Sequence, residues 1–356
     1  MPSHTPLLTP LLVGVSLASC AAHAPLEWSQ LPPLPDAEGF ASPFAGVSYG
    51  ALIVGGGANI PEDKWTEVFT KVWYDSVFVL HPGALEWSTG PKLPRALGYG
   101  VSITAADSVL CFGGSDSTRH YPDSFRMQWV ADKLEISPLP ALPRPCANAC
   151  GALLGRVIYI AGGTETPAST TALSSFWALD LDQLSQGWKE LEPWPGPARM
   201  LSTAGVSGEA FYLFSGASLK AGPDAKPVRT YLKDAYRFHP KQGWSRISDL
   251  PRAAVAAPSP APSSMGTLLI LSGDDGANLD FRPLDRHPGF PRTVLAYDPT
   301  TDTWSKQGDI PLSRVTVPAV RWNKGFVLPN GEVRPRERTP QVWFAREKPE
   351  AAPPKK

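Results

Sequence analysis

This sequence has few cysteines, few histidines and no excess of either charge. Among its 356 residues are 4 Cys and 6 His, and no C-x-x-C pair or H-E-x-x-H motif occurs. Cys146 and Cys150, four apart on a strand, would lie about 13 Å from each other, too far for a disulfide. The sequence therefore predicts no metal site and no disulfide framework, and Cys111, Cys146 and Cys150 are expected to be small core residues.

Charge is balanced, with 33 basic and 33 acidic residues and a formal net charge of zero. This balance gives no global support for binding nucleic acid or a polybasic membrane surface. After the N-terminus no apolar run is long enough to cross a bilayer. Recognition of a charged partner would have to be local.

The N-terminal segment is typical of an export signal. An apolar stretch from Leu7 to Leu17 is followed by Ala18, Ser19 and Cys20, which resembles a bacterial lipoprotein signal with Cys20 as the lipidated residue. Ala22-His23-Ala24 is the rival cleavage point. Residues 1–20 are thus predicted to be a signal peptide, and the protein to be exported, either periplasmic or lipid-anchored to the bacterial envelope.

Proline and glycine are abundant, with 40 Pro and 31 Gly. Such a content excludes long helices over most of the chain. A hydrophobic fraction of 42% with 12 Trp, 9 Tyr and 14 Phe argues equally against disorder. A mostly β protein with a sizeable core is expected.

A repeat with a period of about 55 residues is the strongest signal in the sequence. Six apolar runs each end at a glycine turn: 51–57, 109–114, 157–163, 210–216, 268–273 and 325–331. Most are followed by a second apolar strand, a strand marked by Trp (Trp87, Trp188, Trp244, Trp304), and a Leu-Pro or similar pair with an Arg. The repeat resembles kelch, in which each unit is one four-stranded propeller blade.

Counting strands predicts a closed ring. The last unit lacks a Trp-bearing fourth strand, and the N-terminus has an unpaired one, Leu26 to Leu31. We expect an all-β, six-bladed kelch-type β-propeller over residues 26–345, closed by the N-terminal strand, with a disordered tail at 346–356. Two packed β-sandwiches, the alternative, do not explain six regular units and one unpaired strand.

Antiparallel hairpins place the start of each first strand and the end of each second strand at one rim of the channel. The arginines after the Leu-Pro pairs are therefore candidates for binding an anion: Arg95, Arg144, Arg199, Arg252 and Arg314. Asp274 and Asp275 end the second strand of the fifth unit at this rim, and their loop continues to His287, a residue type suited to proton transfer near neutral pH. These three are candidates for hydrogen bonds to a bound substrate or for acid catalysis.

The last unit departs from the others after its second strand. Glu332 directly follows the turn Asn330-Gly331, and Arg334, Arg336 and Arg338 share its short loop. A carboxylate beside several cations stays ionised and well oriented, which suits a general base. The alternative is an ordinary solvated charged loop.

Asn330-Gly331-Glu332, with Pro335, Arg338-Thr339 and Val342, resembles the blade of the bacterial N-acetylneuraminate epimerases, the sialic acid mutarotases, that bears the proposed proton acceptor. The resemblance puts Glu332 in the acceptor's place and Arg338 in that of the family's arginine. Leu93 to Ser102 also matches, in rotated order, as in a cyclically permuted branch of the family.

The resemblance implies an isomerase that interconverts the α and β anomers of N-acetylneuraminate or a related acidic sugar. It implies no metal or organic cofactor, a small-molecule acidic sugar as partner, and membrane contact only through a lipid anchor. Oligomeric state is not predicted. A non-catalytic carbohydrate- or protein-binding propeller is the alternative function, because a propeller does not fix activity. A copper oxidase on the same fold would need a Tyr and His cluster for which the sequence gives no signal.

Overall fold

The computed structural model describes Met1 and residues 26–131, 133–224 and 226–347. Residues 2–20 of the predicted signal peptide, with Cys20, and residues 348–356 lie outside this part of the chain. Helical structure in the described residues is limited to two short 3₁₀ turns, η1 (Leu184–Gln186) and η2 (Leu284–Arg286). None of the described helices could span a membrane.

Six four-stranded antiparallel sheets form the blades of the ring. Blade one is β2 (Phe44–Ser48), β3 (Ala51–Gly55), β6 (Val77–Leu80) and β7 (Ser88–Thr89). Blade two is β8 (Val101–Ala105), β9 (Ser108–Phe112), β10 (Ser124–Val130) and β11 (Lys133–Leu139). Blade three is β12 (Cys150–Leu154), β13 (Val157–Ala161), β14 (Phe176–Asp180) and β15 (Lys189–Leu191).

The second half of the chain repeats this order. Blade four is β16 (Thr203–Ser207), β17 (Ala210–Phe214), β20 (Ala235–His239) and β21 (Gly243–Ile247). Blade five is β22 (Ser263–Ser264), β23 (Thr267–Leu271), β24 (Thr293–Asp298) and β25 (Thr303–Asp309). Blade six is β26 (Val320–Trp322), β27 (Gly325–Pro329), β30 (Val342–Glu347) and β1 (Leu26–Leu31). The six-bladed prediction is confirmed.

The N-terminal strand closes the ring as predicted. β1 pairs antiparallel with β30 from Leu26 opposite Glu347 to Leu31 opposite Val342. Trp28 packs edge-on against Phe326 of β27, with ring centroids 5.6 Å apart. The last strand reaches Glu347, so the ring extends two residues into the segment that was expected to be a tail.

Hydrophobic clusters fill the spaces between neighbouring blades, one at each of the six junctions. The repeat's tryptophans add a hydrogen bond across four of these junctions. Each indole Nε1 donates to a carbonyl that follows the outer strand of the preceding blade: Trp87 to Pro32, Trp188 to Pro140, Trp244 to Glu192 and Trp304 to Ser248. The Trp signal thus reports a contact between blades. Cys111, Cys146 and Cys150 are buried free thiols, as expected.

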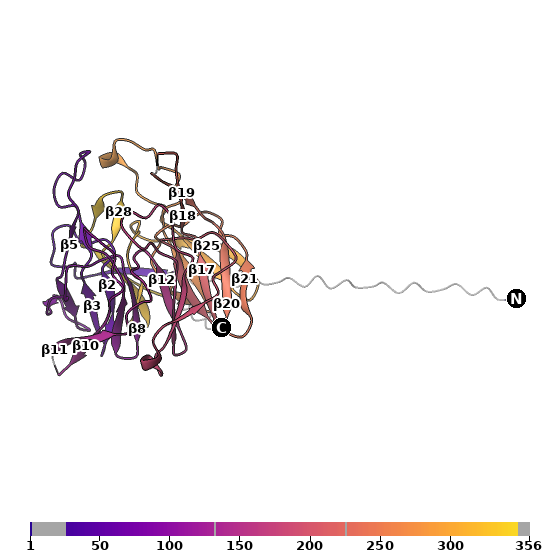
Figure 1. The fold of residues 1–356 in the computed structure, drawn as a ribbon, viewed down its shortest axis with the longest axis horizontal. Helices are drawn as coiled ribbons and strands as arrows, with labels where there is room; N and C mark the ends of the chain where they lie inside the picture. Colours follow the sequence, from indigo (N-terminus) through magenta and orange to yellow (C-terminus); the bar gives the residue numbers. More distant parts are fainter. Residues whose placement is uncertain (2–25, 132, 225, 348–356) are drawn as a thin grey trace.

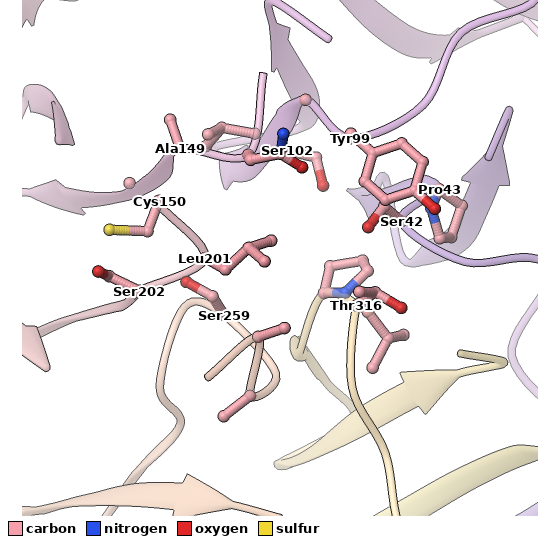
Figure 2. Close-up of a pocket in the computed structure, with 18 residues that line it drawn as sticks. Ser42, Pro43, Tyr99, Ser102, Ala149, Cys150, Leu201, Ser202, Ser259 and Thr316 are labelled. Atoms are coloured by element: carbon pink, nitrogen blue, oxygen red, sulfur yellow. The ribbon is translucent and has the colours of Figure 1, made fainter. Parts of the chain in front are cut away.

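A ring of backbone hydrogen bonds surrounds the central channel. One residue at the start of each blade has a left-handed conformation, with φ between 48 and 63°, and its N–H donates to the carbonyl of its counterpart in the preceding blade over 2.5 to 3.0 Å. The six residues are Ser42, Tyr99, Asn148, Leu201, Ala256 and Thr316. Figure 2 shows several of them with other small or uncharged side chains around the channel, which encloses about 70 Å³. The closed ring of bonds holds the strained backbone in place.

Three short hairpins leave the blades at their glycine turns. They are β4 (Ala58–Asn59) with β5 (Val72–Trp73), β18 (Ala217–Ala221) with β19 (Pro227–Tyr231), and β28 (Glu332–Arg334) with β29 (Glu337–Arg338). Figure 1 shows β18, β19 and β28 on the same side of the ring, away from the β10–β11 turn. This face carries the candidate site.

Candidate functional site

Two acidic side chains occupy equivalent positions in neighbouring blades. In every blade the residue after the glycine turn forms an isolated bridge with the residue just before the left-handed one. Around the ring these residues are Ala58, Ser115, Thr164, Ala217, Asp274 and Glu332. The fold therefore places one carboxylate from blade five beside one from blade six at the channel mouth.

Gly331 makes the turn that aims Glu332. Its φ is 109°, and a Cβ atom there would lie 3.0 Å from the Cβ of Val317 and 3.2 Å from the Cδ of Arg314. Only glycine fits such an approach without displacing its neighbours. Asn330 before it is fully buried.

The Glu332 carboxylate is held by two groups of its own hairpin. Glu332 lies directly opposite Arg338, and Oε2 is 3.5 Å from Nη2 of the guanidinium. Oε1 accepts a hydrogen bond of 2.8 Å from the backbone N–H of Arg336. The exposed fractions of the two side chains are 15% for Glu332 and 4% for Arg338. The two residues that the family resemblance singles out are thus in contact, and the carboxylate has a fixed orientation.

Arg336 is itself anchored to blade one. Its φ is 69°, and its Nη1 donates to the carbonyls of Lys64 at 3.2 Å and Thr66 at 2.7 Å. The guanidinium carbon lies 4.0 Å from the ring centroid of Phe69. A loop from the opposite end of the chain thus fixes the N–H that binds Glu332.

A cavity of about 330 Å³ opens beside Glu332 on this face. Three of the predicted residues line it, Asp274, His287 and Glu332. The other lining residues include Arg229 and Tyr231 of β19, Arg282, and apolar side chains such as Phe290. A concave, partly apolar site with a few convergent polar groups is the usual form of a small-molecule site.

Asp274 accepts two hydrogen bonds at this cavity. The Tyr231 hydroxyl donates to Oδ2 at 2.7 Å, and the Gly276 N–H donates to Oδ1 at 3.0 Å. Burial, and then the hydrogen bond to Asp274, raise the pKa of Tyr231. With both oxygens acting as acceptors, Asp274 is arranged as a carboxylate. Its neighbour Asp275 accepts from the Ala277 N–H at 3.0 Å and does not line the cavity.

His287 is buried with its hydrogen-bonding direction fixed. The N–H of Gly289 donates to Nδ1 at 3.1 Å, so the neutral ring carries its proton on Nε2. The rings of Phe281 and Phe290 lie 5.5 and 6.0 Å from the imidazole. The side chain offers the cavity an oriented donor.

The five arginines of the repeat have partners inside the blades, and none lines the channel or this cavity. Arg199 is fully buried and binds Asp234 through two hydrogen bonds of 3.0 and 2.7 Å. Arg314 is also fully buried, donates to the Ser313 carbonyl at 3.1 Å, and has its pKa lowered to about 9 by burial.

The other three arginines lie earlier in their repeats than Arg199 and Arg314 do in theirs. Arg252 donates to the carbonyls of Ser272 and Thr293. Arg95 and Arg144 form partly exposed ion pairs with Asp123 at 3.1 Å and Glu190 at 3.9 Å. The expected convergence of five arginines on the channel mouth is not observed, because acidic side chains and carbonyls within the blades bind them.

No group of three or more His, Cys, Asp or Glu side chains is arranged to hold a metal ion within the described ranges. The polar groups that line the cavity include carboxylates, an imidazole, a phenol and guanidinium groups.

Comparison with known proteins shows to which family the chain belongs. The model of the N-acetylneuraminate epimerase family matches residues 15–136 and 139–281, more than half of the chain. The chain belongs to the N-acetylneuraminate epimerase family. The matched ranges contain Asp274, Arg229 and Tyr231 but end before Glu332 and Arg338.

Curated relatives carry the same name. The N-acetylneuraminate epimerase of Yersinia enterocolitica is 28% identical over 232 residues, which are 57% of this chain and 56% of the relative. That of Salmonella typhimurium is 40% identical over 104 residues, 26% of each chain. The matched part of the chain thus spans little more than half the length of the Yersinia enterocolitica relative. A solved structure titled "Structure of YjhT" superposes with a TM-score of 0.64 at 14% identity, covering 87% of this chain and 95% of that one. It confirms the fold.

The sequence pattern did not identify two residues that line this cavity. Arg229 and Tyr231 lie on β19, which with β18 forms a hairpin between the second and third strands of blade four. The available signal was the alternation in Val228-Arg229-Thr230-Tyr231. Pro227 at its start weakens this signal, because proline is unfavourable in most strand positions.

Proposed function

We propose that this protein is a sugar mutarotase that interconverts the α and β anomers of N-acetylneuraminate or a related acidic sugar. Family membership and the name of its relatives support the reaction class. The observation that carries the proposal is the Glu332 carboxylate, bonded by the Arg336 N–H and paired with Arg338, at the wall of a cavity large enough for a monosaccharide.

Glu332 acts as the general base. Mutarotation begins when the proton of the anomeric hydroxyl at C2 leaves, the bond between C2 and the ring oxygen breaks, and a C2 carbonyl forms. Glu332 takes that proton through one carboxylate oxygen. Both oxygens of the reaction are attached to C2, so the same carboxyl group can return the proton to the ring oxygen, and atoms and charge balance without a second titrating residue.

His287 and Asp274 assist from the same cavity. The Nε2–H of His287 is a fixed donor suited to the negative charge that develops on the departing ring oxygen. Asp274, with Tyr231, is suited to the sugar hydroxyls. Rotation of the opened chain about its C2–C3 bond exposes the other face of the carbonyl, and reclosure with the reverse proton transfers gives the second anomer.

Arg338 positions the base. Its Nη2 lies 3.5 Å from Glu332, and Nε and Nη1 have no hydrogen-bond partner among the described residues although the side chain is 4% exposed. An arginine with so little solvent and few partners favours a nearby negative charge. This supports a role in holding the Glu332 carboxylate in its position and orientation.

The test is proton NMR of N-acetylneuraminate freshly released as the pure α anomer by a sialidase. The protein is expected to speed the appearance of the β anomer well above the spontaneous rate. Binding without acceleration would replace the enzyme with the non-catalytic binder, and neither binding nor acceleration would remove the sialic acid assignment.

A further inference from the structure

The cavity has an acidic wall and a basic wall. Asp274 and Glu332 lie on the side formed by blades five and six, and Arg229 and Arg282 are its lining cations. An anionic substrate would be repelled by the two carboxylates and must place its own charge near a cation. An acidic sugar therefore fits the cavity in one orientation, with its negative charge toward the basic wall.

Of the two cations, Arg282 is already engaged. Its Nη1 donates to the carbonyls of Leu279 at 3.2 Å and Phe281 at 2.7 Å. Arg229 is exposed and forms no ion pair with any described residue. Its guanidinium contacts Tyr231 and partly offsets the rise in the pKa of that phenol, and with five N–H donors it still has donors to spare.

The strand beneath Arg229 is fixed although its side chain is exposed. Residues two apart on a strand point to the same side, so Arg229 and Tyr231 face the cavity together. Tyr231 is tied to Asp274 by its hydroxyl, and its ring packs on Gly276, where a Cβ atom would come within 3.3 Å. The guanidinium thus extends from an anchored strand end.

We propose that Arg229 binds the carboxylate of the substrate and so makes the protein selective for acidic over neutral sugars. This rests on the proposed function and adds the residue that sets its substrate class. A planar guanidinium can bind a carboxylate through two parallel N–H donors. The β18–β19 hairpin, which the other blades lack in this length, is then the specificity element of the site.

The experiment compares N-acetylneuraminate with its methyl ester, which keeps the reducing sugar but loses the charge. Wild type is expected to show a lower KM for the acid, and Arg229→Met to raise that KM about 10- to 100-fold, the range for a charged hydrogen bond. The KM for the ester and kcat should change less than about 3-fold. Arg229→Lys should recover part of the preference. Lys220→Met removes a cation from the opposite face of the same hairpin and is the matched control.

An unchanged acid-to-ester ratio in Arg229→Met would overturn the proposal, as would a wild type without preference. If wild type accelerates neither sugar, the proposed function fails and calorimetric binding decides on Arg229 separately. Tighter binding of the acid than of the ester that depends on Arg229 would then support its role, and equal or no binding would overturn it.

Discussion

Removing the partner of a buried arginine tests whether the repeat's arginines hold the fold or bind substrate. Arg199 is fully buried, and Asp234, whose side chain is 13% exposed, binds it through two hydrogen bonds. Tyr236 donates a further bond of 2.6 Å to the same carboxylate. Asp234→Asn keeps the shape of this side chain but leaves the arginine's charge without compensation.

The expected cost is large for one substitution. Breaking a buried pair by removing one partner destabilises a protein by about 3–5 kcal/mol. At about 2 °C per kcal/mol for a domain of this size, the melting temperature should fall by about 6–10 °C. Asp123→Asn is the matched control. The side chains of the Arg95–Asp123 pair are 41% and 51% exposed, so this pair contributes at most about 1 kcal/mol to stability.

The same pair predicts a pH dependence. Burial alone would raise the pKa of Asp234, but the hydrogen bonds and charge of Arg199 outweigh it and lower the pKa in the folded protein. The carboxylate therefore stabilises the fold above its ordinary pKa of about 3.9, and this contribution is lost as the pH falls through the lowered value. The gap in melting temperature between wild type and Asp234→Asn should narrow below about pH 4.

Differential scanning calorimetry measures both effects, and mutarotation kinetics at 25 °C accompany it. A melting temperature of Asp234→Asn less than 2 °C below that of wild type would refute the structural role. A KM raised about tenfold in a protein of normal stability would also refute it and would indicate that Arg199 binds substrate.

Three further outcomes are expected. Deleting residues 21–35 removes β1 and leaves blade six with an open edge, so the melting temperature should fall and aggregation increase on light scattering; a stable, monomeric product would rule out this closure. Arg336→Gly keeps the N–H that binds Glu332 but loses the anchor on blade one, so kcat should fall about 3- to 10-fold at constant KM; equal kcat would contradict it. Radiolabelled fatty acid should tag wild type and not Cys20→Ala; no label on either would leave simple secretion.

The fold was predictable because propeller closure reduces to counting. Six glycine-ended runs set the number of blades, and the unpaired strand around Trp28 set where the ring closes. The ring of left-handed residues was not predictable, because Tyr99, Leu201 and Thr316 have no local preference for positive φ. Hydrogen bonds between blades impose that conformation, and no single repeat contains them.

The candidate site was likewise predictable only in part. The position of Asp274 and Glu332 at the channel mouth was predictable, because each directly follows a glycine turn and the blade geometry fixes where that turn lies. The arginines were not, because a Leu-Pro-Arg motif does not determine which way a long side chain turns. Asp234 draws Arg199 into the blade, a contact between residues 35 positions apart in the chain that no spacing reveals.

The rate of Glu332→Gln in the α-to-β assay tests the central claim most directly. Glutamine keeps the shape of the side chain but cannot accept a proton, so the enzyme-dependent rate should fall about 100-fold or more, with the melting temperature unchanged within about 2 °C. Glu337→Gln alters a carboxylate of the same hairpin that pairs with Arg334 and does not line the cavity, and it should stay within about 3-fold of wild type. A Glu332→Gln protein that catalyses at the wild-type rate would contradict the account.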